Sequence, residues 1–170
     1  MTLPRKQVLN MTTPPSAPSR IVLGLWPIAG VTTIGVTAEA ARATIAAAIE
    51  GGVSTFDTAY SYRFDGESDR LIGQFSRTER ERFTIIGKVG QRWDASHNRV
   101  IDGSPAQLTL DAEESLRRMQ LDYVDILFLH SPDPGVPLEQ SAAALARLQE
   151  RGLCRRIGIS NASGSQISQF

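Results

Sequence analysis

Short apolar runs alternate with longer segments of helical periodicity along the chain from about residue 20. The apolar runs are rich in β-branched and aliphatic residues, a composition typical of strands. They predict strands at 21–26, 53–57, 83–89, 123–129 and 156–160. The run at 83–89 is apolar at nearly every position, which indicates a strand that is covered on both faces.

The segments between these runs carry apolar residues at helical spacing. They predict helices from Thr37 to Gly51, from Glu67 to Phe75, from Ser104 through Met119 and from Leu138 to Arg151, and the opening of a fifth helix at 163–170. A strand followed by a helix, repeated with connections of this length, suits right-handed crossovers. The pattern therefore predicts an α/β fold with a parallel sheet.

The helix that begins at Ser104 has strong local signals. Ser104 and Gln107 have the spacing of a capping box, and Pro105 stands at the first helical position, where its missing N–H is not needed. Four charged residues of this helix are expected to face water: Glu113, Glu114, Arg117 and Arg118. The segment before it, 90–103, is predicted to be a surface loop.

Polar side chains end four successive predicted strands. They are Asp57, Lys88, His130, and Ser160 with Asn161. Because the carboxyl ends of parallel strands meet on one face of a sheet or barrel, we expect these side chains to surround one point. Taken singly, each has an ordinary structural interpretation, such as a turn-capping aspartate or a lysine paired at the surface. Taken together, they predict a shared site.

Tyr62, five residues after Asp57, adds a proton donor to this group. Reduction of a carbonyl by hydride transfer builds negative charge on oxygen and needs a donor within hydrogen-bonding reach. The reference pKa of tyrosine is about 10, so we expect the Lys88 ammonium to lower the pKa of Tyr62. Asp57 would hold Lys88 in its charged form, and His130 would orient or polarise the carbonyl.

The stretch STFDTAYSYRFDGESDRLIG, residues 54–73, resembles the signature of the aldo-keto reductase family. The segments EESLRRMQLDYVDILFLH and GISN also look like family segments, so the resemblance covers nearly everything from about Arg20 to the end of the chain. It implies that the family's catalytic tetrad is Asp57, Tyr62, Lys88 and His130.

Two neighbours of Tyr62 bear on this resemblance. Tyr60 competes for the tyrosine role, but the five-residue spacing from Asp57 favours Tyr62. Arg63 stands where relatives often have glycine.

The resemblance also implies a fold, a cofactor and a reaction. The family fold is an eight-stranded (β/α) barrel, so the chain is expected to form an incomplete TIM-barrel-type domain over 20–170, with about five of the eight strands, after a disordered lead-in at 1–19. The implied reaction is NADPH-dependent reduction of aldehydes or ketones with Tyr62 as proton donor. Ser160 and Asn161 would hold the nicotinamide carboxamide, and Asp57 would lie near the nicotinamide ribose.

Two alternatives to a working reductase remain open. The chain could be a catalytically inactive truncated fragment, or a non-catalytic NADP-binding or regulatory module on the same scaffold. A glycosidase built on acidic residues would leave Lys88 and His130 unexplained. The expected partner is a small carbonyl substrate, and open sheet edges favour self-association or pairing with a complementing chain.

Composition narrows the class of protein further. Eighteen basic residues balance eighteen acidic ones, so the chain carries no electrostatic footprint for nucleic acid or an anionic membrane. No window approaches the length and hydrophobicity of a membrane span. The two histidines are widely separated and no metal site is predicted.

A single cysteine, Cys154, suits a reducing compartment, and we expect a cytoplasmic protein. The first twenty residues are basic and free of acids, which leaves an organelle transit peptide as an alternative.

Overall fold

A central parallel sheet organises the structure, a computed structural model that describes residues 19–30, 33 and 35–170. Its five strands are neighbours in the order in which they occur in the chain, and every pair is parallel. They are β1 (Val22–Gly24), β2 (Thr55–Asp57), β3 (Thr84–Val89), β6 (Val124–Leu129) and β7 (Cys154–Ile159). The prediction of five parallel strands in a barrel-type α/β arrangement is therefore confirmed. Apart from residue 19, the predicted lead-in at 1–19 lies outside the described residues.

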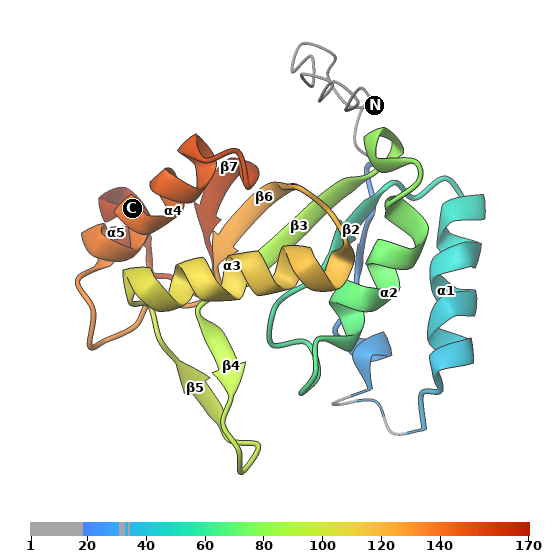
Figure 1. Cartoon of the computed structure of the whole chain (residues 1–170), viewed down its shortest axis with the longest axis horizontal. Coiled ribbons are helices and arrows are strands. Elements are labelled where there is room, and N and C mark those ends of the chain that lie inside the picture. Colours follow the sequence, from blue (N-terminus) through green and yellow to red (C-terminus); the bar gives the residue numbers. More distant parts are fainter. Residues whose placement is uncertain (1–18, 31–32, 34) are drawn as a thin grey trace, which may run out of the picture.

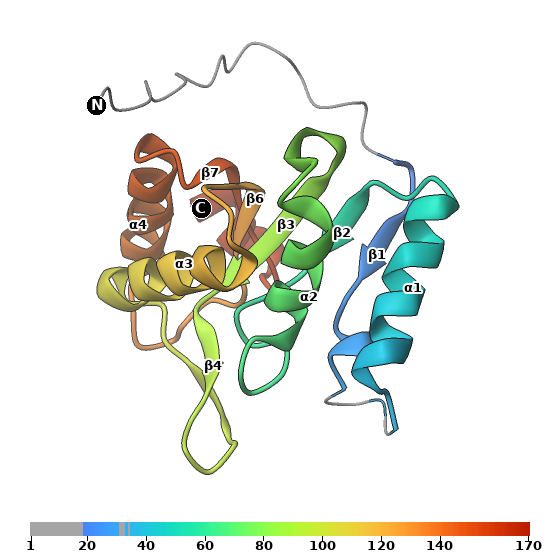
Figure 2. The same cartoon turned by 45° about the vertical axis from the view of Figure 1, so that its right-hand side comes forward.

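One layer of helices covers one face of this sheet (Figures 1 and 2). Its members are α1 (Ala38–Glu50), α2 (Glu67–Ser76), α3 (Pro105–Met119) and α4 (Leu138–Glu150). The short helix α5 (Gly164–Gln169) follows β7, and two 3-10 turns, η1 (Pro27–Ala29) and η2 (Arg80–Arg82), complete the helical elements of the described residues. No helix among these described elements is long and apolar enough to cross a membrane.

The core lies between the sheet and this helical layer. Residues that alternate along the strands point toward the helices and are fully or nearly fully buried, among them Phe56, Ile85, Val89, Leu127 and Leu129. The residues between them point to the opposite, concave face, where Ile86, Ile126 and Phe128 are only half-buried and Arg156 is exposed. The period-two alternation of the strands thus separates a packed face from an open one.

Helix α3 packs as its apolar positions predict, but two details of the prediction are wrong. Ser104 makes no side-chain capping bond; its own N–H donates to Asp102 Oδ1 at 3.0 Å, and the side-chain amide of Gln107 donates to Asp111 Oδ1 at 2.9 Å. Arg118 does not face water: its guanidinium carbon lies 4.5 Å from the centroid of the Tyr60 ring, and its side chain is 10% exposed. A tertiary neighbour, which local spacing cannot reveal, decides the environment of Arg118, whereas competing partners nearby in the chain decide the outcome at Ser104.

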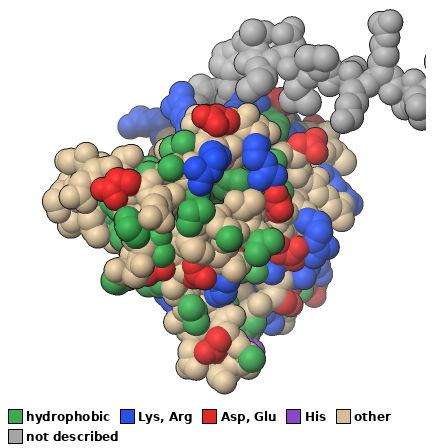
Figure 3. Space-filling model, turned by 60° about the vertical axis from the view of Figure 1, so that its left-hand side comes forward, with side chains coloured by type: hydrophobic (Ala, Val, Ile, Leu, Met, Phe, Trp, Pro, Cys, Tyr) green, Lys and Arg blue, Asp and Glu red, His purple; other side chains and the backbone are tan. Residues whose placement is uncertain are grey.

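The segment 90–103 is a β-hairpin rather than a loop. Its strands, β4 (Gln91–Trp93) and β5 (Arg99–Ile101), pair antiparallel, with Trp93 opposite Arg99. The hairpin projects from the body of the molecule (Figure 1), and in Figure 3 it forms the lower end, below a face on which hydrophobic side chains are interspersed with charged ones of both signs. Strands of three residues are too short to produce a readable alternation, which explains the wrong prediction.

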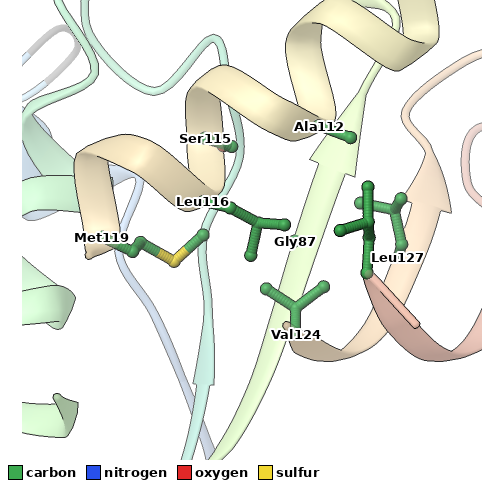
Figure 4. Close-up of a pocket in the computed structure, with 8 residues that line it drawn as sticks. Gly87, Ala112, Ser115, Leu116, Met119, Val124 and Leu127 are labelled. Atoms are coloured by element: carbon green, nitrogen blue, oxygen red, sulfur yellow. The ribbon is translucent and has the colours of Figure 1, made fainter. Parts of the chain in front are cut away.

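A small apolar cavity lies between α3 and the sheet (Figure 4). Gly87 of β3 lies at its floor, and side chains of α3, β6 and Leu153 close it. The space is about that of one water molecule, so it is a packing gap and not a substrate site. Cys154 is also buried, and burial raises the pKa of its thiol to about 11, which makes it a packing residue.

Candidate active site

The four predicted tetrad residues meet at the carboxyl ends of β2, β3 and β6. Asp57 is the last residue of β2, Lys88 is near the end of β3, and His130 directly follows β6. Tyr62 reaches them from the loop after β2. The parallel order of these strands brings together side chains that lie up to 73 positions apart in the sequence.

Lys88 is the centre of the hydrogen-bonded part of this group. Its Nζ donates to Asp57 Oδ1, to Tyr62 Oη at 2.9 Å and to the Thr58 carbonyl oxygen at 3.2 Å. Tyr62 Oη also donates to Asp57 Oδ1, at 3.2 Å. The lysine is only 8% exposed, so this ion pair is largely shielded from water.

The pKa of Tyr62 is raised above its ordinary value, which corrects the expectation that Lys88 lowers it. Burial of the phenol is the main cause, followed by the charge of Asp57 and its hydrogen bond to the hydroxyl, while Arg99 opposes them. The Lys88 charge is already matched by Asp57, and burial lowers the pKa of the lysine itself. Tyr62 therefore holds its proton at neutral pH.

His130 is a neutral imidazole beside Tyr62. Burial lowers its pKa to about 4, helped by the positive charges of Lys88 and Arg99. Its ring lies edge-on to Tyr62 with 5.9 Å between centroids, and its Nδ1 is 3.5 Å from Ser61 Oγ. A neutral imidazole can still donate one hydrogen bond.

Ser160 and Asn161 lie at the next strand end and flank His130. The Ser160 N–H donates to the Leu129 carbonyl oxygen at 2.9 Å, and Asn161 Nδ2 donates to the His130 carbonyl oxygen at 2.8 Å. Among the described residues, neither Ser160 Oγ nor Asn161 Oδ1 has a hydrogen-bond partner. Both oxygens are thus available to a ligand at this edge.

A buried carboxyl group, that of Asp69, is hydrogen-bonded to the start of the Tyr62 loop. Asp69 of α2 is fully buried and accepts hydrogen bonds from Thr58 Oγ1 at 2.8 Å and from Ser115 Oγ at 2.5 Å. Burial raises the pKa of Asp69 to about 6, although these hydrogen bonds act to lower it. Sequence patterns did not single out Asp69, although an acid on the apolar stripe of α2, between Ser68 and Leu71, is a usable signal.

The two neighbours of Tyr62 occupy different environments. Tyr60 lies under Arg118, and among the described residues no hydrogen bond joins its hydroxyl to Asp57 or Lys88. Arg63 has φ +69°, in the left-handed region that favours glycine. The loop therefore adopts at Arg63 a backbone conformation for which glycine is suited.

Two tryptophans that were not among the predicted site residues form a wall beside it. Trp26 lies edge-on to the Tyr62 ring, with 5.2 Å between centroids. Trp93 of the hairpin donates its Nε1 hydrogen to the Ser61 carbonyl oxygen at 2.8 Å. These contacts join β1 and the hairpin to the Tyr62 loop, and no local pattern could indicate them.

Comparison with known proteins places this arrangement in a family. The profile of the Aldo/keto reductase family matches residues 20–170. The chain belongs to the aldo/keto reductase family. It is 35% identical over 153 residues to Aldo-keto reductase YhdN of Bacillus subtilis, an alignment that covers 89% of this chain and 46% of the relative.

Two solved structures of the family are also similar. The glycerol dehydrogenase AKR11B4 of Gluconobacter oxydans matches with a TM-score of 0.79 and 31% identity, over 88% of this chain and 47% of that one. An aldo/keto reductase of Klebsiella pneumoniae, solved in complex with NADP and acetate, matches with a TM-score of 0.68 and 30% identity, over 85% and 47% of the two chains. The chain thus spans about half the length of these relatives.

Proposed function

We propose that the site reduces aldehydes or ketones with NADPH as hydride donor and Tyr62 as proton donor. The observation that carries this proposal is the contact of Lys88 with both Asp57 and Tyr62, beside a neutral His130. Membership of the aldo/keto reductase family supports the reaction class. The NADP in the Klebsiella pneumoniae structure supports the cofactor.

The residues at the edge of the sheet suit a nicotinamide. Its carboxamide needs both donors and acceptors, and a hydroxyl with an amide oxygen supplies them. Ser160 and Asn161 would hold that group next to His130, and Asp57 would lie near the ribose. The bound cofactor would supply the hydride, while the chain supplies the proton and the orientation of the substrate.

The tetrad would transfer one proton, from the Tyr62 hydroxyl to the substrate's carbonyl oxygen. As the carbonyl oxygen gains negative charge, the Tyr62 hydroxyl would donate its proton to it, and His130 would hold that oxygen by a hydrogen bond. The resulting phenolate would be stabilised by Lys88 at 2.9 Å, with Asp57 keeping the ammonium in place. The raised pKa of Tyr62 keeps the phenol protonated before the reaction, and Lys88 would act on the phenolate only as it forms.

The test combines NADPH binding, followed by fluorescence titration, with turnover of 4-nitrobenzaldehyde. Tyr62→Phe and Lys88→Met are expected to lower kcat by at least about 100-fold without loss of the folded state. Tyr60→Phe is the matched control, because it removes the same hydroxyl two residues away and should keep activity within about twofold. Equal losses in both tyrosine variants, or no NADPH binding by the folded chain, would contradict the proposal.

We also propose that the active form is an assembly through the open sheet. The edge strand β1 exposes Val22 at 47%, and Phe128 on the concave face is only half-buried. Among the described residues β1 pairs only with β2, and a sheet edge of this kind favours association with a second copy or a complementing chain. Light scattering of the purified chain, with and without NADPH, tests this, and a strictly monomeric active enzyme would rule it out.

A further inference from the structure

Arg99 is held between two indole rings beside the candidate active site. Its guanidinium carbon lies 5.2 Å from the centroid of the Trp26 ring and 5.1 Å from that of Trp93. Trp26 contacts Tyr62, and Trp93 donates a hydrogen bond to the carbonyl oxygen of Ser61. Arg99 is itself exposed, and these contacts hold its guanidinium group beside the loop that carries Tyr62.

The charge of Arg99 has no acidic partner in the described part of the chain. Its side chain makes no ion pair and no hydrogen bond there, so its N–H donors are unsatisfied by protein. The acids of the same hairpin are engaged elsewhere: Asp94 accepts the N–H groups of Ser96 and Asn98, both at 2.8 Å, and Asp102 lies 3.9 Å from a different arginine.

The field of Arg99 reaches the reacting groups. Its positive charge acts to lower the pKa of both Tyr62 and His130. The other cation of the site, Lys88, is neutralised by Asp57. A substrate at Tyr62 therefore meets an excess of positive charge on the side of the hairpin.

We propose, on the basis of the reductase function above, that Arg99 binds a carboxylate on the carbonyl substrate. A guanidinium between two rings keeps its N–H edges open, and those edges match a carboxylate with two parallel hydrogen bonds. Trp26 is the neighbour of both Arg99 and Tyr62, so a substrate that spans the two lies along one indole ring. The substrate class is an aldehyde or ketone that carries a carboxylate on an aromatic or short aliphatic body.

The test compares 4-formylbenzoate with its neutral analogue 4-formylbenzamide. Trp26 and Trp93 are the two tryptophans of the chain and both contact Arg99, so intrinsic fluorescence reports binding without turnover. We expect the carboxylate to bind about tenfold or more tightly than the amide and to be reduced with a kcat/KM about tenfold or more higher. Both preferences should weaken in high salt. Arg99→Gln should bring this ratio close to one, and Arg99→Lys should keep part of it.

The control is Arg42→Gln, on the exposed face of α1, which should leave the ratio unchanged. A purely structural role of Arg99 would lower kcat/KM for both substrates equally, and that result would overturn the proposal. Arg99-dependent binding of 4-formylbenzoate without any turnover would uphold the carboxylate site and reject the reductase function for this chain. Turnover with the same preference in Arg99→Gln would uphold the reductase and reject the carboxylate site.

Discussion

The Lys88 ammonium and the Tyr62 hydroxyl, 2.9 Å apart, share one acceptor, Oδ1 of Asp57. The carboxylate therefore acts on both groups at once. It supports the charged form of the lysine and opposes ionisation of the tyrosine. The effect on the tyrosine can be measured by replacing Asp57 with asparagine, which removes the charge and keeps the shape of the side chain.

Asp57→Asn is expected to lower the pKa of Tyr62. The substitution removes the negative charge that raises this pKa, replaces the carboxylate acceptor by a weaker neutral amide oxygen, and leaves the Lys88 charge unmatched beside the phenol. Titration of ¹³C-labelled tyrosine, with the signal assigned by its absence in Tyr62→Phe, measures the change. Asp65→Asn, an exposed residue paired with Arg70, is the control, and an unchanged Tyr62 pKa in Asp57→Asn would contradict the expectation.

His130 is expected to stay neutral down to about pH 4. Because an unfolded histidine binds its proton below about pH 6.5, the unfolded state holds more protons than the folded state between these values. His130 therefore makes the protein less stable as pH falls from about 6.5 to about 4. Urea unfolding at both ends of this window should show a smaller loss in His130→Gln than in the wild type, with His97→Gln as the control.

A direct titration of the His130 ring by NMR completes this test. The ring signals should not move between pH 5 and pH 8. A midpoint near the ordinary histidine value would show that burial and the charge of Lys88 do not act on the ring as the structure indicates.

Gly87→Ala is expected to stabilise the protein, and Gly73→Ala to destabilise it. A Cβ at Gly87 would point toward the apolar cavity of Figure 4, with its nearest neighbour, a Leu127 methyl carbon, at 3.5 Å. A Cβ at Gly73 would lie 2.3 Å from the backbone oxygen of Met119. We expect a gain of about 0.5–1 kcal/mol in the free energy of unfolding for the first and a loss of about 1–3 kcal/mol for the second.

Urea titrations of the two alanine variants check these signs. Intrinsic propensity alone would favour alanine at both positions, since one glycine is in a strand and the other in a helix. Equal shifts of the two midpoints would therefore mean that the close approach of α2 to α3 at Met119 does not control the outcome.

Arg63→Gly is expected to raise the free energy of unfolding by about 1 kcal/mol relative to Arg63→Ala. Both variants lose the arginine side chain, which lies near Gly30, but only glycine relieves the positive φ of +69°. Thermal unfolding of the pair measures the difference. An alanine variant as stable as the glycine variant would show that the loop carries no strain at this position.

The predicted strands are most accurate where a long apolar run lies between two neighbouring strands, as at 83–89 and 123–129. The expectation that 83–89 is covered on both faces is wrong for the described residues, because Thr84 and Ile86 on its concave face are only half-buried. The hairpin of β4 and β5 was missed because each strand has three residues. The capping box at Ser104 was wrong because Gln107 binds Asp111 instead, whereas a complete capping box occurs at Ser163, in α5. Short-range hydrogen-bonding choices of this kind depend on which of several acceptors nearby in the chain takes the donor, here Asp102 for the Ser104 N–H and Asp111 for Gln107.

Local periodicity is enough to predict the alternation of strands and helices and the positions of Asp57, Lys88 and His130 at strand ends. The parallel direction of the strands then brings those ends to one edge of the sheet. The direction of the Tyr62 pKa shift and the place of Arg99 against Trp26 and Trp93 follow only from the folded chain. Both depend on burial and on contacts between segments far apart in the chain, and a linear pattern does not record those distances.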